Sequence, residues 1–403
     1  MIPYGDFPFF LIALIILLPI IILGIFGRKN IHLNFVATLI MIVLIFKDDT
    51  HFLFVPYLSY ALLSLAVFVL LQIVLIKLYI KIAVKKNTLP IFIAVLLFSI
   101  LPLIIVKVLQ SSLLGLSSWM IYDTPAKNIF GFLGISYIMF KCIQIILEVR
   151  DKRIKSMNTY DLLRFLLFFP TISSGPIDRY KRFLKDEAKP LTKERYSDLL
   201  SKAIHYIFIG FLYKYIIAYL INTYIINTIH FDTDPFIYKL GYMYAYAFYL
   251  FFDFAGYSLF AIAFSYLLSI ETPPNFNKPF LAKNIKDFWN RWHMSLSFWF
   301  RDMIYMRFVF FMSKKKYIKN NLVVSNIGFM INFMVMGIWH GIEWFYIVYG
   351  LYHGILFVLY SYYEQWKKKH PLKIPAKVMD VIGIIVTFHI VAFGFLIFSG
   401  KLF

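Results

Sequence analysis

Charged residues are scarce in this sequence. Only 15% of its 403 residues are Asp, Glu, Lys or Arg, whereas 61% are hydrophobic and 20% are aromatic. Because a soluble domain carries roughly a quarter charged residues, the composition excludes a soluble protein of this length. Short alternating strands between turns, which a membrane β-barrel requires, are also missing. The sequence therefore predicts an all-α polytopic membrane protein, with residues 1–403 forming a single membrane domain.

Cysteine is almost absent. The one cysteine, Cys142, lies in an apolar segment and is expected to be a small buried residue. A single cysteine excludes an intrachain disulfide and a cysteine-based metal centre. The HExxH pattern is missing as well, and the nearest set of candidate ligands is His340, Glu343 and His353. Since a zinc site needs three or four ligands with supporting partners, we predict no metal.

Acidic residues are outnumbered by basic ones. The chain has 41 Lys and Arg but only 21 Asp and Glu, which gives a net charge of +20. In membrane proteins such an excess marks cytoplasmic loops, and the position of the basic clusters predicts an extracellular N-terminus. Anionic lipid explains the charge in part, and an acidic soluble partner at the inner face would be attracted by it. We predict the bilayer and an acidic protein as partners, and no nucleic acid.

About ten hydrophobic runs approach the ~20 residues that a spanning helix needs. Residues 160–183 interrupt this pattern with prolines and a glycine, and they form either a re-entrant segment or a cytoplasmic loop. A polar interfacial helix is expected over 186–202. In total we expect about ten or eleven transmembrane helices plus re-entrant and interfacial helices. The predicted spans are 7–26, 31–46, 56–80, 89–109, 129–147, 203–226, 238–268, 322–340, 345–360 and 378–398.

Residues 284–307 are amphipathic and contain a histidine, His293. A continuous helix here would place one titratable group on an aromatic face, because the spacing is i, i+4, i+7 and i+11. The alternative is a helix that only lies in the membrane interface, with its charged residues pairing with each other or with headgroups. The residues on the expected face are Trp289, His293, Leu296 and Phe300.

A second histidine, His340, lies in the apolar run 337–343. Ionisable residues at membrane depth are costly and usually functional, although a hydrogen-bonded packing histidine is the alternative. We expect His340 and His293 to meet at one site. A neutral imidazole there could take the proton from a hydroxyl that attacks an acyl carbonyl. Serine residues are available too, but the GxSxG nucleophile motif is absent.

Two motifs resemble the signatures of the membrane-bound O-acyltransferase family. They are WNRWHMSLSFWFRDMIY (289–305) around the first histidine and MGIWHG (336–341) around the second. Three further stretches resemble the bacterial branch of that family: PTISSGPIDRYKRF (170–183), FFDFAGYS (251–258) and TPPNF (272–276). The resemblance covers essentially the whole chain.

This resemblance implies a ring of tilted helices around a central funnel, with His340 as catalytic base and His293 in a second role, either handling the substrate or assisting. It also implies the transfer of D-alanine from a phosphopantetheine thioester on an acidic cytoplasmic carrier protein, with no tightly bound cofactor. The D-alanine would cross the plasma membrane of a Gram-positive bacterium, with the help of other D-alanylation membrane proteins, and esterify lipoteichoic acid. The implied channel or motif residues are Trp289, Trp292, Arg301, Asp302, Trp339, Ser174, Gly175, Pro176 and Asp178.

Two other functions remain open at this point. Broken helices and polar residues at the membrane midplane also suit a transporter or flippase of an acylated intermediate, which would do no covalent chemistry. A family member that O-acetylates a polysaccharide is the second alternative. A flippase would leave the thioester of the carrier protein intact, and an O-acetylating enzyme would use a different acyl donor.

Overall fold

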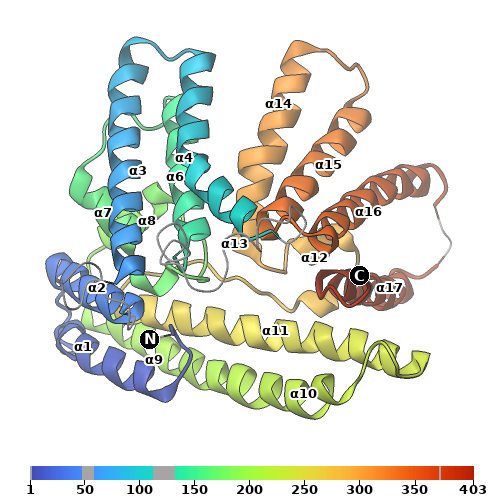
Figure 1. The fold of residues 1–403 in the computed structure, drawn as a ribbon, viewed down its shortest axis with the longest axis horizontal. Helices are drawn as coiled ribbons and strands as arrows, with labels where there is room; N and C mark the ends of the chain where they lie inside the picture. Colours follow the sequence, from blue (N-terminus) through green and yellow to red (C-terminus); the bar gives the residue numbers. More distant parts are fainter. Residues whose placement is uncertain (1, 48–58, 112–131, 372–373) are drawn as a thin grey trace. The chain divides into compact units, whose positions relative to one another are not determined.

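The computed structural model describes residues 2–47, 59–111, 132–371 and 374–403 (Figure 1). All regular structure in these ranges is helical, which confirms the predicted all-α fold. Among the described residues, eight helices are long and apolar enough to cross a membrane. They are α1 (Phe7–Ile25), α3 (Tyr60–Lys85), α4 (Leu89–Leu109), the helical run Lys193–Thr228, α11 (Phe236–Leu267), α15 (Asn321–His340), α16 (Trp344–Lys369) and α17 (Ala376–Phe398).

The remaining expected helices differ in length or position. The predicted span 31–46 forms α2 (Ile31–Phe46), which is apolar but has only 16 residues. The span 129–147 lies partly outside the described residues, and its described part forms the mostly buried helix α6 (Ile135–Arg150). The prediction of one interfacial helix over 186–202 was wrong. The chain instead ends α8 (Tyr180–Glu187) and begins α9 (Lys193–Phe211), whose polar first turns continue directly into apolar ones.

The chain divides into two compact units, of which the first contains the described residues 2–47, 59–110, 132–210 and 257–273. Here α3 and α4 both pack against α6 (Figure 1). Next to α6 the chain forms α7 (Thr159–Leu167) and the short η1 (Phe169–Thr171), followed by irregular backbone. The irregular part is buried in protein, as a re-entrant segment requires. Lys141 of α6 donates to the carbonyl oxygen of Phe165 at 2.9 Å and so satisfies the end of α7.

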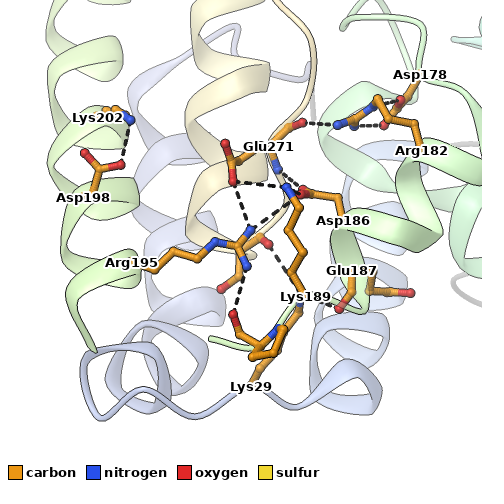
Figure 2. A network of polar contacts seen from close by, with 12 residues as sticks. Lys29, Asp178, Arg182, Asp186, Glu187, Lys189, Arg195, Asp198, Lys202 and Glu271 are labelled. Atoms are coloured by element: carbon orange, nitrogen blue, oxygen red, sulfur yellow. Dashed lines mark hydrogen bonds and ion pairs between the residues drawn. The ribbon is translucent and has the colours of Figure 1, made fainter. Parts of the chain in front are cut away.

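A network of ion pairs fixes this buried segment in the first unit (Figure 2). Asp178 is 2% exposed and accepts two hydrogen bonds from the guanidinium of Arg182. Arg182 also donates to the backbone oxygen of Glu271 at 2.5 Å, and Asp186 accepts from the backbone N–H of Glu271 at 2.5 Å. Arg195 of α9 reaches the Glu271 carboxylate at 3.0 Å. The network therefore holds Glu271 in the loop that follows α11.

Asp178→Asn is expected to destabilise the protein by about 2 kcal/mol, because it removes the charge of a buried carboxylate and leaves the Arg182 guanidinium without its anionic partner. Asp198→Asn is the matched control. The Asp198–Lys202 pair is also in Figure 2, but its side chains are 59% and 49% exposed. Such a surface pair contributes only about 0–1 kcal/mol. Thermal unfolding of the detergent-solubilised protein checks this, and equal midpoints for both variants would contradict it.

The second unit contains the described residues 111, 211–256, 274–371 and 374–403. Its helices α15 and α16 pack along each other (Figure 1). Their backbones come close at two glycines. A Cβ atom on Gly337 would lie 2.5 Å from the backbone oxygen of Tyr346, and one on Gly350 would lie 2.6 Å from the backbone oxygen of Phe333. The shorter elements of this unit are η2 (Leu212–Ala218), α10 (Tyr219–Tyr224), η3 (Ile226–Thr228), η4 (Pro279–Leu281), α12 (Ile285–Trp289), α13 (Met294–Phe300), η5 (Arg301–Tyr305) and α14 (Met306–Lys315).

Candidate functional site

The amphipathic stretch is not one continuous helix. It is divided into α12 and α13 by a turn that ends at His293, whose backbone is left-handed with φ 41° and ψ 51°. Trp289 and Phe300 therefore belong to different helices. The prediction that they lie on one face of a continuous helix was wrong. A histidine is among the non-glycine residues that tolerate this conformation best. The spacing of hydrophobic residues could not predict this break, because the break depends on the backbone conformation of a single residue.

A loop earlier in the chain fixes the turn at His293. The backbone N–H of Met294 donates to the backbone oxygen of Asn275 at 2.8 Å, and the N–H of Asn277 donates to the oxygen of Arg291 at 2.9 Å. The hydroxyl of Ser295 also donates to Oδ1 of Asn275 at 2.5 Å. These bonds replace the helical ones that the break removes. Within the TPPNF motif, Asn275 is thus the residue that holds the histidine turn.

His293 is buried in an apolar environment outside the eight candidate spans. Its side chain is 5% exposed, and its ring lies 4.7 Å from that of Phe254 in an edge-to-face contact. Within the described part of the chain, its Nδ1 atom has no hydrogen-bond partner. Burial, and to a lesser extent the nearby charge of His340, lowers the pKa of His293 to about 3. His293 is therefore neutral near pH 7, and the two histidines lie close enough to influence each other.

His340 is the last residue of α15 and lies among aromatic rings. Its ring centroid lies 4.5 Å from that of Trp339, 5.0 Å from Phe398 and 5.9 Å from Tyr346. The following residue, Gly341, permits this packing, because a Cβ atom there would lie 2.6 Å from the ring of Tyr346. The imidazole is thus held at a helix end by rigid neighbours, as a catalytic group needs.

A cavity of about 270 Å³ lies between α12, α13, η5, α15 and α16 of the second unit. Neither histidine is among the residues that line it. Met336 lines it, however, and lies four residues before His340 on α15, so the two side chains are on the same helix face about one turn apart. The cavity thus approaches His340 from within the unit. Its lining includes Trp289, Ser297, Arg301, Asn332, Phe333 and Met336.

The other predicted site residues have different environments. Trp292 packs against Phe395 with ring centroids 4.7 Å apart and belongs to the core. Arg301 lines the cavity and pairs with its neighbour Asp302 at 2.9 Å. Trp339 lies beside His340. The second unit thus contains seven of the predicted residues, and the first unit contains the other four: Ser174, Gly175, Pro176 and Asp178.

The first-unit residues form a tight buried turn. A Cβ atom on Gly175 would lie 2.7 Å from the Cα of Thr171, so the backbone can only take this course with a glycine. The neighbouring Ser173 hydrogen-bonds to the hydroxyl of Tyr257. These contacts, together with the ion pair of Asp178, give this motif a structural role in the first unit.

Two residues near the site were missed in the sequence analysis. The sequence indicated Asn275 only as a member of the TPPNF motif, and it indicated His353 only as a possible metal ligand. His353 lies in α16, is fully buried and accepts a hydrogen bond from the indole N–H of Trp289 at 3.3 Å. The sequence shows a polar residue within an apolar run, but it does not show which side chain this residue will contact in the folded protein.

Comparison with known proteins agrees with the motifs. The family described as MBOAT, membrane-bound O-acyltransferase, matches residues 57–400. The chain is 49% identical over 408 residues to the teichoic acid D-alanyltransferase of Bacillus subtilis (strain 168), a match that covers 100% of this chain and 98% of that protein. It is 42% identical over 419 residues to the teichoic acid D-alanyltransferase of Lacticaseibacillus rhamnosus, a match that covers 99% of this chain and 97% of that protein.

A more distant relative is the peptidoglycan O-acetyltransferase of Helicobacter pylori. It is 29% identical over 254 residues, which cover 60% of this chain and 44% of that protein. The family match extends over most of the chain, and both histidine motifs lie within it. The chain therefore belongs to the membrane-bound O-acyltransferase family and is a multi-pass membrane acyltransferase.

Proposed function

We propose that this acyltransferase transfers D-alanyl groups that end as esters on lipoteichoic acid. The observation that carries the proposal is the cavity that approaches His340 along α15 and has Trp289 and Arg301 of the first histidine motif in its wall. The two relatives that match nearly the whole chain are named teichoic acid D-alanyltransferases, which supports D-alanine as the acyl group.

The donor in this proposal is a D-alanyl thioester on the phosphopantetheine arm of an acidic carrier protein. A pantetheine arm is a slender chain with amide groups, and the cavity offers both aromatic walls and polar groups to such a chain. The lining includes the neutral polar residues Asn290, Ser297, Tyr305 and Asn332 and the basic residue Lys286. A net charge of +20 would attract an acidic carrier to the inner face. The arm arrives with the carrier, so no tightly bound cofactor is needed.

His340 acts as general base in this mechanism. Its imidazole takes the proton of the acceptor hydroxyl while the hydroxyl oxygen attacks the thioester carbonyl carbon. The tetrahedral intermediate then expels the pantetheine thiolate, which takes the proton back from the imidazolium, so the products are an ester and a free thiol. His293 remains neutral, and its Nδ1 atom, which has no partner among the described residues, is available to a reacting group.

The basic clusters give the proposed direction of transfer. With the N-terminus outside the cell, the clusters around residues 314–319 and 367–369 face the cytoplasm, where the carrier is loaded. The acyl group then leaves toward the outer face, where other D-alanylation membrane proteins take part. The alternative of polysaccharide O-acetylation has weaker support, because the O-acetyltransferase relative matches only 60% of the chain.

Loss of the carrier thioester distinguishes this proposal from a flippase. Vesicles that contain the purified protein and membrane acceptors are expected to consume D-[14C]alanyl carrier protein and to form ester-linked D-alanine. Protein-free vesicles are the control, and acetyl-loaded carrier tests the O-acetylating alternative. If the thioester persists at the level of the control, or if the acetyl group is used in preference, the proposed function is wrong.

A further inference from the structure

His353 is completely enclosed by the protein. It is 0% exposed, and its ring centroid lies 5.1 Å from that of Trp289, 4.6 Å from Tyr349 and 5.9 Å from Phe333. The contact with Trp289 is edge-to-face, with an interplanar angle of 87°. A polar ring enclosed in this way is costly in a membrane protein unless it has a specific partner or a function.

The hydrogen bond with Trp289 fixes the chemical state of His353. An indole N–H can only donate, so the Nδ1 atom of His353, 3.3 Å from Trp289 Nε1, must be the unprotonated acceptor. The single ring proton of the neutral imidazole is then on Nε2. On that side the ring lies against the backbone of Gly394 in α17, where a Cβ atom would come within 2.9 Å of Nε2, so only a glycine leaves room for the ring. His353 is therefore a neutral acceptor in a confined position.

The partner of this bond forms a wall of the cavity. Trp289 is the last residue of α12, a helix of only five residues. A helix this short has little stability of its own, so the orientation of the indole depends on its contacts. One contact is Phe333, with ring centroids 5.2 Å apart, and both rings line the cavity. The only side-chain hydrogen bond described for the indole is the one to His353.

We propose that His353 is a positioning residue that sets the orientation of Trp289 and thereby the width of the cavity that receives the acyl donor. This inference rests on the proposed function, in which a pantetheine thioester enters that cavity. His353 itself takes no proton and touches no substrate. If its acceptor atom is lost, the indole rotates into or out of the cavity, and the thioester carbonyl is held less accurately relative to His340.

A double-mutant cycle tests this inference. We expect His353→Leu to raise the KM for D-alanyl carrier protein about tenfold, the equivalent of one hydrogen bond of about 1.4 kcal/mol. His353→Asn keeps an oxygen acceptor near the position of Nδ1 and should restore most of the affinity. Trp289→Phe removes the donor. In the Trp289→Phe background, His353→Leu is then expected to have little further effect, because the two residues act through one interaction.

A purely structural role would give a different result. If His353→Leu costs as much in the Trp289→Phe background as in the wild type, or if it leaves KM unchanged, the inference is wrong. If His353→Leu does not fold, the comparison of His353→Asn with Trp289→Phe decides: near-wild-type KM for the first and a raised KM for the second are expected. Turnover of the thioester by the wild-type protein tests the proposed function separately, so the two failures can be told apart.

Discussion

Replacing His340 with alanine is expected to lower the rate of D-alanyl transfer by a factor of about 10²–10⁴, the usual contribution of a general base. The imidazole lies at the end of α15, one turn beyond the cavity, and is held by Trp339, Phe398 and Tyr346. Alanine removes the proton acceptor but keeps the helix. The measurement is the rate of thioester loss from D-alanyl carrier protein at saturating concentration, so that kcat is compared.

The control for this variant is His389→Ala. His389 is also on a spanning helix of the second unit, but it is exposed and hydrogen-bonds to the backbone oxygen of Ile385 in its own helix. The rate of thioester loss with the His389→Ala variant should stay close to that of the wild type. Equal rates for His340→Ala and the wild-type protein, at matched amounts in the membrane, would show that the base is another group.

The sequence was most informative where composition decides the structure. Long apolar runs with few charges can only be helices in a bilayer, and this gave the fold class and most of the spans. The structure also places His293 and His340 in one unit, close enough to influence each other, and their joint role at one site stays a prediction. Periodicity failed at His293, because the left-handed turn there is stabilised by Asn275, a residue outside the helix pattern.

The cavity could not be predicted for a related reason. Its wall combines side chains from five helical elements, and each of them is an ordinary aromatic or polar residue in its own segment. His353 is a clear example, because its role depends on meeting Trp289, which lies 64 positions earlier. The contact of Asp178 is more local, because its ion-pair partner Arg182 lies only four positions later. Its role as a site residue stays a prediction from the motif.

Gly337→Ala is expected to cause the second large loss of activity, about a hundredfold, because a displacement of about 1 Å at a catalytic group has an effect of this size. The new Cβ atom would lie 2.5 Å from the backbone oxygen of Tyr346 and 3.1 Å from the Cα of Gly350. Backbone atoms cannot rotate away as a flexible side chain can, so α15 and α16 must move apart. His340 lies three residues further along α15 and moves with it.

Gly241→Ala separates this effect from the general consequence of replacing a helical glycine. Gly241 lies in α11, and nothing lies within 4 Å of the position that a Cβ atom would take there. This control should be slightly more stable than the wild type, by about 0.5–1 kcal/mol, because alanine loses less conformational entropy than glycine in a helix. Gly337→Ala should be destabilised by about 1–3 kcal/mol through overpacking. Wild-type activity in Gly337→Ala would mean that α15 can shift against α16 without moving His340 out of its working position, and the tight contact would then have no role in catalysis.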